Sequence, residues 1–220
     1  MTVVVDVREI FADPAVAELA EAVAEGDAAE IRRRAAGVDL RARGDKNVTL
    51  LEWAVLNKSP VGLRSLLELG ADPAQPGIDG STVVHLAAMA NDPTYLEALL
   101  EYGADPDTAH SETGMTPLSS ALMGSRAVQF KRLLIAGADV DRADRMGNTA
   151  LHVAAKTNQP GAALELLQAG ADPAPRNAQN VTFQRYLFMT PPTVLSAQAR
   201  RDRDALVAWL RDRGHAVEGG

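Results

Sequence analysis

Residues 144–155 read DRMGNTALHVAA, and features of this stretch recur along the chain. Its threonine has counterparts 33, 34, 33 and 33 residues apart, at Thr49, Thr82, Thr116, Thr149 and Thr182. A glycine followed two residues later by aspartate repeats with the same period, at Gly37, Gly70, Gly103, Gly137 and Gly170. Self-similarity at a period of about 33 residues is typical of stacked helix pairs. The sequence therefore predicts a helical solenoid, a fold that mostly presents a binding surface.

Each period contains two predicted helices. In the second repeat they lie near residues 50–57 and 60–69, and Ser59-Pro60 supplies the cap and the first-turn proline of the second helix. We expect the core between helices to come from paired leucines, at Leu66-Leu67, Leu99-Leu100, Leu133-Leu134 and Leu166-Leu167. The periodic glycine then ends the second helix in the left-handed conformation.

The domain boundaries follow from the same period. Residues 1–12 are predicted to be an irregular leader, and residues 13–220 a single repeat domain. Its repeats lie near 13–43, 44–76, 77–110, 111–143, 144–176 and 177–220, and the first and last are expected to act as caps. In the last repeat the spacing of counterparts grows from 33 to 44 residues, which places an insertion near residues 190–200.

Composition narrows the class of partner. The net charge of −7 disfavours nucleic acid, which requires a basic face. No stretch approaches the ~20 apolar residues of a membrane span, and there is no cysteine to form a disulfide or a thiolate metal site. No signal peptide is visible, and a signal already removed would look the same, so we expect a cytoplasmic or periplasmic location. We expect a protein partner, and a monomer when the chain is alone.

Residues 144–155 are close to the pattern D-x-x-G-x-T-P-L-H-x-A-A, and Thr116-Pro117-Leu118 and Gly137-Ala138-Asp139 match it as well. This is the pattern of the ankyrin repeat, which the chain resembles over residues 14–217. The resemblance implies an all-α solenoid of about six helix-turn-helix repeats with short β-hairpin tips. In that family the tips and first helices line a concave groove that binds other macromolecules, and members are rarely catalytic.

A second resemblance is narrower. The run TFQRYLFMT at residues 182–190, together with residues 144–148 and 84–90, looks like a group of bacterial ankyrin proteins. Some of these are encoded beside lipase-like effectors of contact-dependent secretion systems, where they serve as immunity or accessory proteins. This resemblance implies a secreted hydrolase as the partner.

The sequence offers no catalytic, metal or cofactor site. His85 and His152 occupy the histidine position of the repeat motif, where we expect scaffold hydrogen bonds. Neither a nucleophile elbow, a phosphate-binding loop nor a dinucleotide glycine run is present. We therefore predict that the protein is not an enzyme.

Alignment of the repeats on their threonine gives the candidate partner-binding residues. The position seven residues later, which in the ankyrin arrangement ends the first helix and faces the groove, holds Leu56, Met89, Met123, Lys156 and Met189. Met115 and Met146 fall on tips, where Lys46, Asp79 and Arg145 add a polar rim. Methionine suits adaptable contact surfaces, although it also fills gaps between packed repeats.

The last repeat concentrates aromatic residues, Phe183, Tyr186 and Phe188. They are expected either to close the core or, for Tyr186 in particular, to contact a partner. Residues 200–203, RRDR, are expected to form a solvated helix face. The predicted function is a non-catalytic protein–protein interaction module that binds through its concave face, as an immunity or accessory protein for a secreted lipase-like effector. The alternative is a general cytoplasmic scaffold with several weak partners.

Overall fold

The computed structural model describes residues 6–218, in two compact units that divide between Glu112 and Thr113. The described residues fold into helices and turns, which confirms the predicted all-α class. No helix among them is both long enough and apolar enough to cross a lipid bilayer. A single continuous repeat domain stays a prediction, because each unit is compact by itself.

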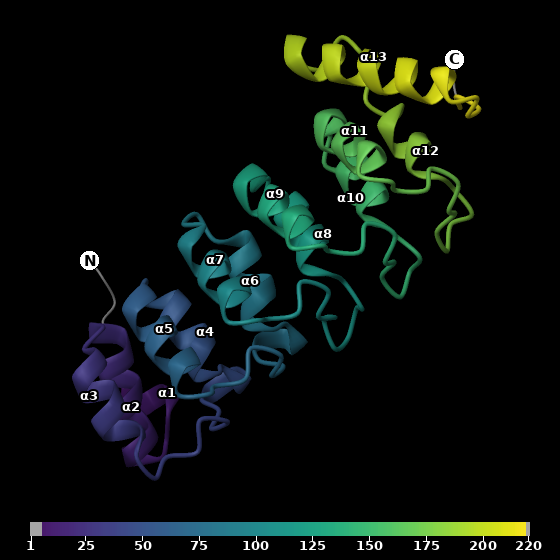
Figure 1. Ribbon diagram of the computed structural model, residues 1–220. Coiled ribbons are helices and arrows are strands. Elements are labelled where there is room, and N and C mark those ends of the chain that lie inside the picture. The colour runs from purple at the N-terminus through teal and green to yellow at the C-terminus, as the bar shows by residue number, and fades with distance from the viewer. Residues whose placement is uncertain (1–5, 219–220) are drawn as a thin grey trace. The chain divides into compact units, whose positions relative to one another are not determined.

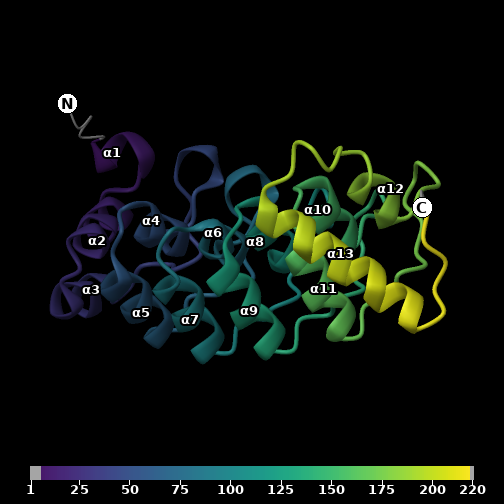
Figure 2. The same cartoon turned by 90° about the horizontal axis from the view of Figure 1, so that it is seen from above.

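The first unit is a stack of three helix pairs preceded by a short helix. The first helices of the pairs, α2, α4 and α6, pack side by side, and the second helices α3, α5 and α7 form a row behind them (Figures 1 and 2). The elements are α1 (Val7–Ile10), α2 (Pro14–Glu25), α3 (Ala28–Ala35), η1 (Asp45–Asn47), α4 (Leu50–Leu56), α5 (Pro60–Glu68), η2 (Ile78–Gly80), α6 (Val83–Met89) and α7 (Thr94–Glu101).

The second unit repeats this arrangement and ends in a longer helix. Here α8, α10 and α12 are the first helices of successive repeats, and α13 packs against α11 (Figure 2). The elements are α8 (Pro117–Met123), α9 (Ala127–Ile135), α10 (Ala150–Lys156), α11 (Pro160–Gln168), α12 (Phe183–Leu187) and α13 (Ala197–Asp212). Ser196 caps α13, as a helix following the predicted insertion requires.

Helix ends follow the periodic residues. Each threonine of the motif is the N-cap of a first helix, and Thr49 and Thr116 accept a hydrogen bond from the amide three residues later. A side-chain acceptor at this position satisfies an amide that the helix itself leaves unpaired. The glycines after the second helices all have positive φ, from +79° to +103°, at Gly37, Gly70, Gly103, Gly137 and Gly170.

The core between the helices is built from the predicted leucines. The first leucine of each pair is completely buried, at Leu66, Leu99, Leu133 and Leu166. Small alanines of the first helices, such as Ala54, Ala87 and Ala121, are also fully buried and let neighbouring helices approach. This combination explains how helices of only seven to nine residues are held in place, since isolated helices of that length are unstable in water.

Among the described residues the tips are tight turns and contain no β-strands, so each predicted β-hairpin is reduced to its turn. In four of the tips the first residue donates to the carbonyl four residues later, for example from Gly77 N–H to Ser81 O at 2.7 Å and from Asn177 N–H to Val181 O at 3.1 Å, and shorter bonds such as that from Gly80 N–H to Gly77 O at 3.2 Å lie within the turn. Between neighbouring tips the backbone contributes single bonds, such as that from Ala178 N–H to Met146 O at 2.8 Å. One bond per neighbour is too few for a sheet ladder.

The N-terminal segment differs in part from the predicted irregular leader. Residues 1–5 lie outside the described residues, and residues 7–10 form the helical turn α1. Phe11 is buried, and its ring meets Trp53 edge-on at 5.6 Å. The Trp53 indole N–H donates to Ala20 O at 2.8 Å. The Phe11 ring thus packs the leader onto α4, and the Trp53 hydrogen bond joins α4 to α2.

One residue of the predicted solvated face in α13 is buried instead. Arg203 is only 7% exposed, and its guanidinium donates to Thr190 O at 2.9 Å. Arg200 and Arg201 are exposed, as expected. Arg203 and Arg200, which donates to Pro192 O at 3.4 Å, both join the insertion to the last helix. The long side chain of Arg203 can be buried because its head reaches a carbonyl.

Glu52 is a completely buried carboxylate at the motif position where His85 and His152 stand in other repeats. It accepts hydrogen bonds from Thr49 N–H at 2.9 Å and from Ile78 N–H at 3.2 Å, so it joins its own helix to the next tip. Gly77 provides the space, because a Cβ on Gly77 would lie 1.8 Å from a Glu52 oxygen. The buried position of the Glu52 carboxylate therefore depends on the absence of a side chain at Gly77.

Gly77→Ala should destabilise the protein by roughly 1–3 kcal/mol, because the added methyl displaces the Glu52 carboxylate from its hydrogen bonds. The same substitution should cost less in a Glu52→Ala background, where nothing occupies that space. Urea unfolding of the four proteins measures both effects. Equal costs in the two backgrounds would show that the two residues are not coupled.

Burial raises the pKa of the Glu52 carboxyl above its ordinary value of 4.5, although hydrogen bonds from Thr49 and Ile78 oppose the shift. A raised folded-state pKa gives stability that is complete below the ordinary pKa and is lost as the pH rises through the folded-state value. The free energy of unfolding of wild type, minus that of Glu52→Gln, should therefore be largest at about pH 4 and fall over the range of pH above the ordinary pKa of 4.5. Chemical unfolding across this range tests the sign, and a difference that rises with pH would contradict it.

Candidate functional site

Leu56 and Met89 are the last residues of α4 and α6, and both side chains are exposed, by 50% and 42%. They lie together in the first unit, where they line a pocket with a volume of about 550 Å³. The rest of the lining comes from the helix ends and the turns that follow: Val55, Lys58, Pro60, Leu86, Ala90, Asn91, Asp92 and Tyr95. Exposed apolar side chains around a hollow are typical of sites that accept an apolar group from a partner.

Of the two candidate tip residues in the first unit, one lines a second, smaller hollow. Lys46 and Asp79 are exposed, and both have positive φ, +54° and +51°. Lys46 and Leu56 line a common pocket of about 170 Å³ with Ile10, Asp45, Val48, Trp53 and Ile78. Asp79 lines none of the described pockets. The first unit thus brings Leu56 together with Met89 on one side and with Lys46 on the other.

In the second unit the equivalent positions are also exposed. Met123 and Lys156 end α8 and α10, and Met189 follows α12 by two residues. Met123 is 53% and Met189 63% exposed. On the tips Met146 and Arg145 are exposed, whereas Met115 is half-buried. Large apolar side chains left in water at successive helix ends are consistent with a contact surface.

Tyr186 is half-buried and belongs to a continuous hydrogen-bonded cluster in the second unit. Asn177 Nδ2 donates to Asn148 Oδ1 and to the Tyr186 hydroxyl, both at 2.9 Å. Lys156 Nζ donates to Asn148 Oδ1 at 2.7 Å and lies 4.6 Å from the centre of the Tyr186 ring. The Tyr186 hydroxyl donates in turn to Gln179 Oε1. Lys156 and Tyr186 are therefore brought together, each fixed by the cluster.

Sequence reasoning missed the centre of this cluster. Neither Asn148 nor Asn177 is among the candidate residues of the sequence analysis, yet both are buried. Asn148 stands one residue before its motif threonine and Asn177 five residues before its own, so the two occupy different positions of the repeat. Their hydrogen bonds cross from one repeat to the next, so the spacing within a repeat gave no sign of them.

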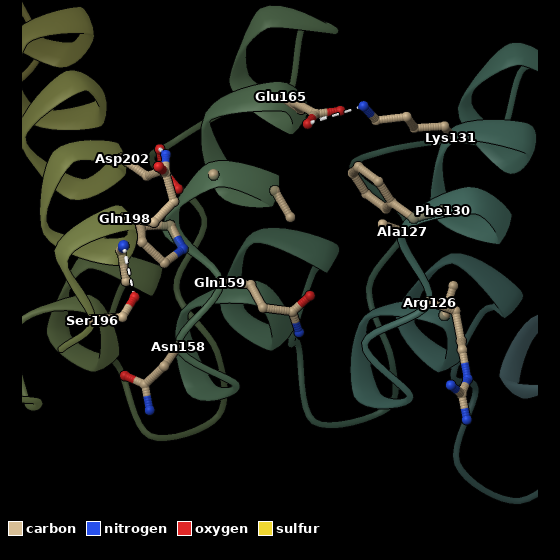
Figure 3. Close-up of a pocket in the computed structure, with 15 residues that line it drawn as sticks. Arg126, Ala127, Phe130, Lys131, Asn158, Gln159, Glu165, Ser196, Gln198 and Asp202 are labelled. Carbon is tan, nitrogen blue, oxygen red and sulfur yellow. Dashed lines mark hydrogen bonds and ion pairs between the residues drawn. The ribbon is translucent and has the colours of Figure 1, made fainter. Parts of the chain in front are cut away.

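A further pocket, of about 330 Å³, lies between α9, α11 and the start of α13 (Figure 3). Ser196, Gln198 and Asp202 border it from the α13 side, and Phe130 lies on the side of α9. Its charged groups are engaged with neighbours: Lys131 pairs with Glu165 at 3.7 Å, and Asp202 accepts from Gln198 Nε2 at 2.7 Å. The pocket therefore offers no converging set of free polar groups for a small ligand.

The motif histidine of the second unit is a scaffold residue. His152 Nδ1 accepts from Thr149 N–H at 3.2 Å, so Nε2 carries the proton and donates to Val181 O at 3.2 Å. Burial lowers the pKa of His152 below its ordinary value of 6.5. His85 Nδ1 likewise accepts from Thr82 N–H, and its ring meets His110 edge-on at 5.9 Å. Among residues 6–218 no three acidic or histidine side chains are grouped to hold a metal ion.

The threonine caps, buried histidine and tip bonds recur at the spacing expected of one repeat family. The sequence family described as "Ankyrin repeats (3 copies)" matches residues 51–144 and, in a second overlapping match, residues 84–177. The chain belongs to the ankyrin-repeat family. Ankyrin-repeat proteins are typically non-catalytic.

Two curated proteins are similar to this ankyrin-repeat chain. Protein PhlB of Serratia liquefaciens is 49% identical over 141 residues, which are 64% of this chain and 62% of that protein. The human SH3 and multiple ankyrin repeat domains protein 2 is 32% identical over 146 residues, which are 66% of this chain and 8% of that protein. The chain thus spans less than two thirds of the length of either relative.

Asn177→Ala should reduce the free energy of unfolding by about 1–3 kcal/mol, because Asn148 and two tip amides would lose buried hydrogen-bond partners. Gln168→Ala, at the exposed end of α11, is the matched control and should change stability by less than about 0.5 kcal/mol. Thermal and urea unfolding measure both variants. Equal, small effects would show that the amide cluster does not stabilise this ankyrin repeat.

Proposed function

We propose that the protein is a non-catalytic module that binds a protein partner through the ends of its first helices and its tips. The observation that carries the proposal is the pocket of about 550 Å³ beside the exposed side chains of Leu56 and Met89. A soluble chain gains nothing by leaving such side chains in water, and a partner that covers them recovers the free energy of burial, about 25 cal/mol per Å².

The second unit supports the same proposal independently. Its exposed apolar residues, Met123, Met146 and Met189, occur with charged residues such as Lys156 and Arg145. An apolar centre with a polar rim is the usual composition of a protein interface. The folded repeats hold these side chains on short, packed helices, so binding costs little ordering of the backbone.

The finer proposal is that this partner is a secreted lipase-like hydrolase, which the protein holds inactive as an immunity or accessory protein. Its support is the resemblance of residues 182–190 to bacterial ankyrin proteins with that role, and the 49% identity to a bacterial relative, Protein PhlB. On this proposal the complex is tight and has one copy of each protein. A general scaffold would instead recover several partners of low affinity.

Met89→Glu together with Met123→Glu should weaken partner binding by at least about 30-fold, because buried charges would replace two apolar contacts. Affinity capture from lysate of the source organism, read by mass spectrometry, compares wild type, the double variant and Ile135→Glu. Ile135 is 78% exposed on a second helix, so its substitution controls for a new surface charge. Circular dichroism verifies that all three proteins keep their helical content.

The capture distinguishes the proposals. One stoichiometric protein that is lost with the double variant and kept with Ile135→Glu supports the proposed surface. If that protein is a hydrolase, its activity should fall to zero at equal molar amounts of the ankyrin-repeat protein. A partner retained by the double variant would exclude the surface, and many weak partners would favour the scaffold.

A further inference from the structure

Lys156 is the charged member of a series that is otherwise apolar. It ends α10, and the equivalent position is methionine in the repeats on either side, Met123 and Met189. Helix α10 packs against both α8 and α12, so these three positions belong to adjacent repeats of one unit. Packed helices lie about 8–10 Å apart, which places a methionine roughly that far on each side of the lysine.

The amine of Lys156 is held in place although the side chain is exposed. Asn148 Oδ1 accepts its hydrogen bond at 2.7 Å, and the Tyr186 ring lies 4.6 Å away on another side. Asn148 is itself fixed, because its amide donates to Asp144 Oδ2 at 2.9 Å and its oxygen also accepts from Asn177. A lysine that is already ordered loses little side-chain entropy when it meets an anion.

The lysine has no internal counter-ion among the described residues. Within the described part of the chain the Lys156 amine contacts the Asn148 side chain and the Tyr186 ring, and neither group is acidic. Asp144, the carboxylate bonded to Asn148, is engaged by the tip itself, since it accepts from Met146 N–H and Asn148 N–H at 2.8 Å each. An ammonium has three N–H donors, so Lys156 keeps donor capacity directed to solvent.

A purely structural role explains this arrangement less well. Lysine in the last turn of a helix usually stabilises the helix by reaching its free carbonyls. Lys156 reaches back to Asn148 and Tyr186 instead, at the tip side of the unit. Methionine occupies the equivalent position in the repeats on either side, so the fold does not require a charge there.

We propose that Lys156 receives a carboxylate from the partner, carried by an extended segment whose apolar side chains cover Met123 and Met189. A segment in the extended polyproline II conformation has three residues per turn and advances about 3.1 Å per residue, so side chains three positions apart lie on one face, about 9 Å from each other. The apolar residues should therefore stand about three positions before and three positions after the aspartate or glutamate. This inference rests on the proposed protein-binding function and specifies the chemistry of the segment that occupies the second unit.

The test uses a random 15-residue peptide library displayed on phage and selected on the full-length chain. Wild type should enrich peptides with an acidic residue flanked at about three positions by apolar residues. Lys156→Met should enrich apolar peptides without the acid, and Lys156→Arg should keep the acidic preference. Met123→Glu should lose the peptides altogether.

The leading peptide is then measured by calorimetry, together with a version in which its acidic residue is the corresponding amide. Changing the acid to the amide should weaken binding to wild type about tenfold or more and leave binding to Lys156→Met nearly unchanged. This coupling would not arise if Lys156 only supported Asn148 and Tyr186, because the peptide carboxylate would then have no specific counter-ion.

The outcomes of these experiments distinguish a failure of the Lys156 inference from a failure of the proposed protein-binding function. Peptides that depend on Met123 but show no acidic preference, or no coupling to Lys156, overturn the inference and leave the proposed surface intact. Peptides that bind equally well to Met123→Glu, or a library without any binder, overturn both.

Discussion

The backbone groups of each tip must be satisfied without the help of a sheet. Backbone hydrogen bonds within the turn and single bonds to a neighbouring tip pair some of these groups, and a side-chain acceptor pairs further amides. In the fifth repeat Asp144 supplies that acceptor from within the tip, and in the sixth Asn177 accepts from Gln179 N–H and Val181 N–H. The third tip begins at Gly77, which has no side chain, and Glu52 of the preceding repeat supplies the acceptor instead. Unsatisfied amides at these places would cost free energy comparable to a lost hydrogen bond.

This constraint explains what could be predicted from the sequence. Threonine caps, left-handed glycines and paired leucines act within one repeat, so their spacing along the chain predicts their place in the fold. Glu52 with Gly77, Asn148 with Asn177 and Arg203 with the Thr190 carbonyl act between segments that are 13 to 29 residues apart. No periodic signal connects such residues, because each pair occurs once. The structure was required to show them.

The residues of the candidate site also fall into two groups, those that the repeat spacing predicts and those that only the structure shows. The series from Leu56 to Met189 was found from spacing alone, and the structure places its members at or just beyond the ends of first helices with exposed side chains. That these residues bind a partner stays a proposal. The fixed position of Lys156 depends on Asn148, Asn177 and Tyr186, which lie on three different elements, and periodicity gives no information on such a cluster. Within each unit, the same tips that maintain the stack also set the chemistry of the surface beside it.

The Glu52–Gly77 contact has a consequence for the order of the repeats. Counted back five residues from the motif threonine, the tips begin with Gly44, Gly77, Ser111, Asp144 and Asn177. A repeat with a buried carboxylate three residues after its motif threonine, as Glu52 is after Thr49, needs a following tip whose first residue has no Cβ. Of the tips after Glu52, only the one that begins at Gly77 meets this need. The second repeat can therefore precede the third but not the fourth, fifth or sixth. Deleting the third repeat, or moving another in its place, would set a Cβ against Glu52, so steric fit as well as covalent connection determines which repeat follows the second.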